Sequence, residues 1–136
     1  MADSRKYNLG GNCAIAAAVC YIIVGITFFS LPLIQRGSQG SKQLTEYFNS
    51  IASDSSLLEL QYWSFSFAAL MGLAVMIAAN RFFRDLSEDL VDWATVVGLI
   101  GYGVMCTNFI RIADVIPQRA KFFVEGGEQI QQAMHG

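Results

Sequence analysis

The sequence predicts an all-α integral membrane protein, a small bundle of three transmembrane helices with a short interfacial amphipathic helix between the first two. The chain is 54% hydrophobic and only 15% charged, with a mean hydropathy of +0.41, which is unusual for a soluble domain. The apolar residues are also gathered into blocks of roughly 20 residues, the length that a helix needs to cross a bilayer. All 136 residues are therefore expected to form one multi-pass transmembrane domain.

The first apolar block, residues 13–34, carries no charge. The polar tail ahead of it contains the pair Gly10–Gly11, which the interior of a helix avoids, so we expect the span to begin after that pair. The block is longer than the apolar core of a typical signal peptide and has no small-x-small cleavage site before Pro32, which favours an uncleaved span. Small residues that let another helix approach closely recur along it: Ala14, Ala18 and Gly25.

A polar segment follows the first span, and its second half predicts a short amphipathic helix at residues 42–53. Apolar residues recur there at helical spacing, with polar residues between them: Leu44, Tyr47, Phe48 and Ile51. The helix is too short and too polar to span a membrane. Two arrangements remain open, a helix lying in the membrane interface and a loop helix folded over the end of the bundle.

The second span is predicted at residues 60–79. It is entered through Tyr62 and Trp63, amphipathic aromatic residues of the kind that lie at the headgroup level. Ala68 and Gly72 lie four residues apart, a spacing that favours close packing against another helix. Both are therefore predicted helix-packing residues.

The connection after the second span is rich in charge. Arg81 and Arg84 are followed by acidic residues as far as Asp92, and the connection is short enough to make the flanking spans an antiparallel hairpin. A solvated charged loop is the ordinary interpretation of such a segment. A carboxylate cluster that holds a metal ion is the alternative, but no histidine or second acidic cluster supports it, so we predict no metal site.

The third span, residues 93–112, contains Gly98 and Gly101, which are predicted to pack against a neighbouring helix. The groove that these glycines leave on the helix would also suit a lipid tail or a flat pigment. Pro117 is expected to end or kink the helix. Residues 117–136 are then a C-terminal tail, with no fourth span.

Alternating helix direction brings five polar residues to the same depth at one membrane face: Glu59, Gln61, Asn108, Arg111 and Asp114. Polar groups in hydrocarbon are costly unless they are paired or face protein or water, so this polar cluster is the candidate site. We expect an acid, Asp114 or Glu59, to pair with Arg111. The ordinary interpretation is that Arg111 pairs locally or extends its side chain toward the headgroups.

The sequence predicts that several kinds of site and partner are absent. The only histidine is His135, and the three cysteines form no C-x-x-C pair, so neither a zinc site nor a histidine-ligated haem or chlorophyll is expected. No serine or cysteine has a histidine within plausible reach and no span carries paired carboxylates, so we expect no catalytic residues and no enzyme activity. A net charge of −2 with no basic patch predicts no nucleic-acid partner.

An interaction role remains. We expect a non-catalytic accessory or assembly subunit that packs against other membrane proteins or associates with itself. Contact with membrane lipid, quinone or carotenoid stays open, and no cofactor-binding residue is assigned. The alternative is a small oligomeric transporter or channel component that uses the polar cluster. Lysines and arginines are balanced between the two faces, so the positive-inside rule does not decide the orientation.

Overall fold

The computed structural model describes the backbone of residues 2–36 and 41–126 and the side chains of residues 9–36 and 44–126. These residues form helices only, in this order: α1 (Ala2–Ser30), the 3-10 helix η1 (Leu33–Gln35), α2 (Ser41–Ser53), α3 (Ser56–Phe83) and α4 (Glu88–Glu125). The all-helical prediction is confirmed. Three helices, α1, α3 and α4, are long and apolar enough to cross a membrane.

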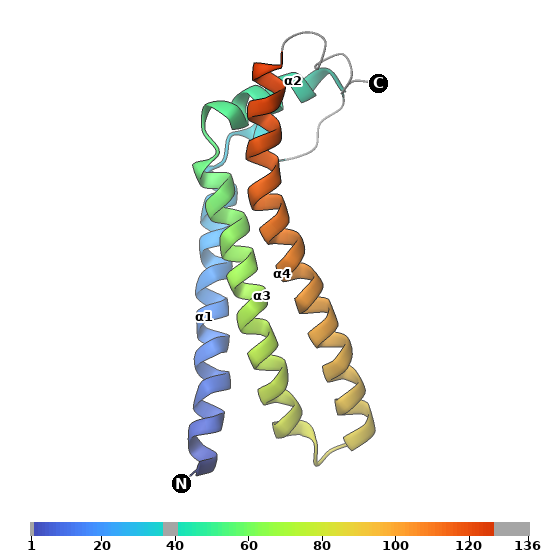
Figure 1. Cartoon of the computed structure of the whole chain (residues 1–136). Coiled ribbons are helices and arrows are strands. Elements are labelled where there is room, and N and C mark those ends of the chain that lie inside the picture. The colour runs from blue at the N-terminus through green and yellow to red at the C-terminus, as the bar shows by residue number, and fades with distance from the viewer. Residues whose placement is uncertain (1, 37–40, 127–136) are drawn as a thin grey trace.

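The three long helices lie in a row with α3 in the centre (Figure 1). α1 packs along α3 and α3 packs along α4, whereas α1 and α4 hardly touch each other. Both outer helices run antiparallel to α3 and so parallel to each other. The start of α1 lies at the same end as the α3–α4 hairpin, and the end of α4 lies at the opposite end with α2 (Figure 1).

α1 begins earlier than predicted. It starts at Ala2 and runs through the pair Gly10–Gly11, which was expected to precede the helix. Gly10 is buried, and a Cβ atom added to it would come within 2.3 Å of the Cβ of Ala78 on α3. The glycine therefore allows two backbones to approach closely, and this packing outweighs its low helix propensity of about 1 kcal/mol.

α1 also ends earlier than predicted, at Ser30 rather than Ile34. The cause is Pro32, which has no N–H to donate and disfavours helical geometry in the residue before it. Arg36 then folds back over the free carbonyls at the helix end, and its Nε donates to the Leu31 oxygen over 2.8 Å. Leu33 and Ile34, predicted to finish the span, belong to η1 instead.

α4 differs most from the prediction at its C-terminal end. Pro117 was expected to end or kink the helix and to begin a tail, but α4 continues to Glu125. A proline inside a helix costs about 3 kcal/mol because one backbone hydrogen bond is lost. Packing beyond the proline offsets this cost, since Ala120 and Phe123 are both fully buried. Residues 127–136 of the predicted tail lie outside the described residues.

α2 folds over the end of the bundle, which is the second of the two arrangements expected for it. Its Ile51 is 1% exposed and shares a small apolar core with Leu31, just after α1, Leu58 of α3 and Ala120 of α4. The ring of Phe48 lies 5.0 Å from the ring of Phe123 on α4. Burial, together with the charge of nearby Tyr62, raises the pKa of Tyr47 above its ordinary value. The apolar face of α2 is thus used inside the molecule.

Candidate functional site

The residues of the predicted polar cluster lie at one end of the bundle. The rings of Phe65 and Phe109 stack between α3 and α4, with their centroids 4.7 Å apart. This register brings the beginning of α3, with Glu59 and Gln61, to the depth of residues 108–114 on α4. Within that end, however, the five side chains divide among separate environments.

The two acids of the cluster line one groove of about 240 Å³ between α3 and α4. The Ser55 hydroxyl donates a hydrogen bond to Glu59 over 2.5 Å, and the Gln118 amide donates one to Asp114 over 2.8 Å. Lys121 lines the same groove. Both carboxylates therefore have hydrogen-bond donors within a turn of helix.

Asn108 and Arg111 line a different groove, of about 210 Å³, on another flank of α4. They share it with Arg119 and with three apolar residues: Ile112, Val115 and Ile116. No acid lines this groove. Within the described part of the chain Arg111 forms no ion pair, so the pairing expected with Asp114 or Glu59 is not formed.

Gln61 lines neither groove. It is only 8% exposed, and its Oε1 atom is buried without a hydrogen-bond partner among the described residues. A buried acceptor left unpaired costs about 1–3 kcal/mol. The arrangement of the cluster is thus two acids in one groove, Asn108 and Arg111 in another, and a buried amide.

Three of the four predicted packing residues make contacts inside the chain. Ala68 is 1% exposed in the centre of α3. A Cβ atom on Gly72 would lie 2.6 Å from the ring of Tyr102, and one on Gly98 would lie 2.3 Å from the terminal methyl of Met76. Side chains of the facing helix thus fill the space beside Gly72 and Gly98 between α3 and α4.

Gly101, the fourth predicted packing residue, behaves differently. It is exposed, and a Cβ atom added to it would meet nothing within 4 Å. Packing of this glycine against a helix outside the chain stays a prediction.

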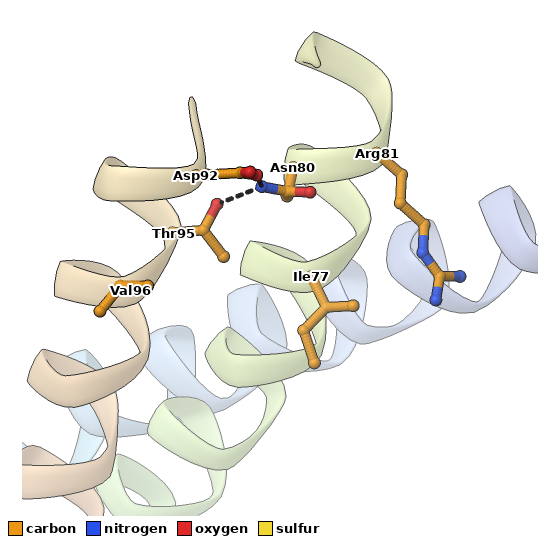
Figure 2. Close-up of a pocket in the computed structure, with 6 residues that line it drawn as sticks. All are labelled: Ile77, Asn80, Arg81, Asp92, Thr95 and Val96. Atoms are coloured by element: carbon orange, nitrogen blue, oxygen red, sulfur yellow. Dashed lines mark hydrogen bonds between the residues drawn. The ribbon is translucent and has the colours of Figure 1, made fainter. Parts of the chain in front are cut away.

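A polar network at the opposite end of the bundle was not predicted (Figure 2). The side-chain amide of Asn80 on α3 donates to the Asp92 carboxylate over 2.7 Å and to the Thr95 hydroxyl over 3.0 Å. Thr95 in turn donates to the backbone oxygen of Val91. The network joins α3 to α4 just before and just after their connection.

Arg84 extends this network into the connection. It pairs with Glu88 at 2.6 Å and lies 3.6 Å from Asp92. The hydrogen bond that Arg84 donates to Glu88, together with the charge of Asp92, raises the pKa of Arg84 above its ordinary value. Arg84 and Glu88 thus pair across the hairpin while their side chains stay more than half exposed, as expected for a solvated charged loop. Among the described residues no group of acids, cysteines and histidines is arranged to hold a metal ion.

A groove of about 420 Å³ lies beside the network, lined by Asn80, Asp92 and Thr95 together with Ile77, Arg81 and Val96. In Figure 2 the side chain of Arg81 extends away from the hydrogen-bonded residues. The sequence did carry a signal for the network, because Asn80 and Thr95 flank the connection of an antiparallel hairpin and must lie at similar depth.

The chain matches no protein-family model, no curated protein and no solved structure.

Proposed function

We propose that the chain is a non-catalytic, multi-pass membrane subunit that packs against other transmembrane helices, from a partner protein or from a second copy. The supporting observation is a face of the three-helix layer that exposes small residues. The proposal assumes that α1, α3 and α4 span the membrane, which their length and composition suggest.

Packing within the chain leaves the outer helices largely uncovered. In the most apolar stretch of α3, 28% of the residues are buried, against 11% in α1 and 6% in α4. The difference follows from the row arrangement, because α3 has a long helix on both sides and each outer helix has a long helix on one side only. α1 and α4 therefore offer most of the surface available to other helices.

α1 has two adjacent stripes of residues with different roles. The stripe that faces α3 is buried or half-buried and repeats at intervals of three and four: Gly10, Cys13, Ala17, Cys20, Val24 and Thr27. The adjacent stripe consists of small residues that are exposed or have open space beside them: Gly11, Ala14, Ala18 and Gly25. Ala14, Ala18 and Gly25, expected to pack against another helix, thus turn away from α3.

α4 has a corresponding outward stripe. Thr95 and Tyr102 face α3, and the residues directly before them, Ala94 and Gly101, are exposed. On α1 each small residue of the outward stripe comes one position after a residue that faces α3, whereas on α4 it comes one position before such a residue. One position corresponds to a rotation of about 100° around the helix axis. Because α1 and α4 run parallel on opposite sides of α3, these opposite rotations have the same result. Both stripes therefore point to the same face of the layer.

We call these residues the small-residue face: Gly11, Ala14, Ala18, Gly25, Ala94 and Gly101. Association of helices in lipid depends on van der Waals packing, and small residues let two backbones approach closely. The small-residue face thus offers close packing to a helix from outside the chain.

The test is a pair of matched substitutions on α4. Gly101→Leu places a large side chain on the small-residue face, while Gly103→Leu makes the same change two residues later on the opposite flank. Neither added Cβ atom meets the chain itself, so both variants should fold. We expect Gly101→Leu to dissociate the complex isolated in mild detergent and Gly103→Leu to leave it intact, as measured by size-exclusion chromatography with light scattering. Equal behaviour of the two variants would remove the small-residue face from the proposal.

A further inference from the structure

We propose that the groove lined by Arg111 and Arg119 binds the phosphate headgroup of an anionic phospholipid. The inference rests on the membrane location assumed in the proposed function, but it concerns a separate set of residues. It assigns a ligand class to a groove that the sequence indicated only in part, through Asn108 and Arg111.

The charge of the groove carries the argument. Arg111 and Arg119 line it without any acid, and neither forms an ion pair with a described residue. The acids at similar depth, Glu59 and Asp114, line the other groove, where Ser55 and Gln118 donate to them. The structure therefore separates charge across α4 and leaves two guanidinium groups available on one flank.

The chemistry of the lining matches a phosphate diester attached to an apolar body. A guanidinium group presents a planar set of N–H donors that suits phosphate oxygens, and the Asn108 amide adds a further donor. The rest of the lining is aliphatic: Ile112, Val115 and Ile116. A small anion would use only the donors, whereas a phospholipid would use both kinds of surface.

The position of the groove favours lipid as the source of the phosphate. Arg111 follows directly on the long apolar run of α4, where a spanning helix leaves the hydrocarbon. Arg119 lies eight residues further on, about 12 Å along the helix axis, toward the aqueous side. An arginine near a membrane surface is attracted to the negative charge of anionic lipid. A groove with two arginines at that boundary therefore favours anionic over zwitterionic lipid.

The experiment uses the full-length chain in nonionic detergent and native mass spectrometry. Phosphatidylglycerol and phosphatidylcholine with identical acyl chains are added to the wild type, to Arg111→Gln/Arg119→Gln and to the control Arg81→Gln/Lys121→Gln. The control removes the same charge from side chains outside this groove. We expect the wild type and the control to prefer phosphatidylglycerol by about tenfold and the groove variant to lose that preference.

Arg119→Gln alone guards against a folding defect, because Arg119 is exposed and lies beyond the apolar run. It should lose part of the preference while the helical circular dichroism is unchanged.

Soluble glycerol phosphate at millimolar concentration should not displace the lipid, and displacement would mean a site for free phosphate. Equal losses in both double variants would mean attraction by net charge only. An unchanged lipid preference with loss of a co-purifying protein would make the groove a protein contact. Each of these three results would overturn the proposal, and none of them depends on Gly101.

Discussion

Single residues decide which surfaces of the helices are used inside the chain. Gly72 and Gly98 occupy positions where α3 and α4 approach closely, whereas Gly101, three residues after Gly98, faces open space. All three look alike in the sequence, because small-residue spacing shows where close packing is possible but not which neighbour supplies it. That distinction needs the rotation of each helix about its axis.

The Asn80 network gives the first prediction at this scale. Asn80→Leu removes two side-chain hydrogen bonds between α3 and α4, each worth about 0.5–1.5 kcal/mol. We expect a loss of roughly 1–2 kcal/mol in the free energy of unfolding, measured by denaturation in mixed micelles. Asn108→Leu is the matched control, since Asn108 is exposed, and it should change stability little. A control that lost as much as Asn80→Leu would show that the network does not hold the hairpin.

The predicted polar cluster shows what residue patterns could and could not supply. Depth was predictable, because alternating helix direction brings Glu59 and Arg111 to the same end of the bundle. The partners of Arg111 were not predictable, because pairing depends on the flank of α4 from which each side chain extends. Asp114 lies three residues away yet accepts from Gln118 instead.

At the scale of elements, the existence and order of the helices were predictable and several boundaries were not. Apolar blocks of membrane length gave the cores of α1, α3 and α4, and helical periodicity gave α2. The errors lie where tertiary packing overrides a local signal, as at Gly10, which contacts Ala78, and at Pro117, beyond which Phe123 is buried. Neither contact is visible in a short window of sequence.

The C-terminal end of α4 leads to a prediction about α2. Phe123 is fully buried and its ring lies against Phe48, so Phe123→Ala should cost about 3–5 kcal/mol and release α2 from the bundle. Phe122→Ala is the neighbouring control, because Phe122 is 57% exposed. Limited proteolysis should cut within α2 in the Phe123 variant and not in the control. Resistance in both variants would show that α2 is held by other contacts.

At the scale of the whole molecule, the fold is a layer of three long helices in which the start of α1 and the end of α4 lie at opposite ends (Figure 1). If the layer spans a membrane, Ser53 at the end of α2 and Ser87 in the hairpin lie on opposite faces. Both are exposed. Single cysteines at these positions, with Cys13, Cys20 and Cys106 replaced, should react with an impermeant reagent from opposite sides of sealed vesicles. Labelling from one side only would contradict three crossings.

The layer also differs from a closed bundle in a way that bears on function. A closed three-helix bundle would turn its small residues inward, whereas here α1 and α4 hardly touch and part of their small-residue stripes is left outward. Contact with quinone or carotenoid stays a prediction from the apolar composition. The central claim is that other transmembrane helices cover the small-residue face.

Cysteine crosslinking in the native membrane tests that claim most directly. Gly25→Cys and Gly101→Cys place thiols on the small-residue face, and Gly103→Cys places one on the opposite flank of α4, all in a chain without its native cysteines. A short reagent that reacts with the thiol at one end and carries a photoreactive group at the other should join the variants at positions 25 and 101 to a second polypeptide, whether a partner or another copy. The variant at position 103 should stay a monomer. Crosslinking at position 103 but not at 25 or 101 would contradict the account.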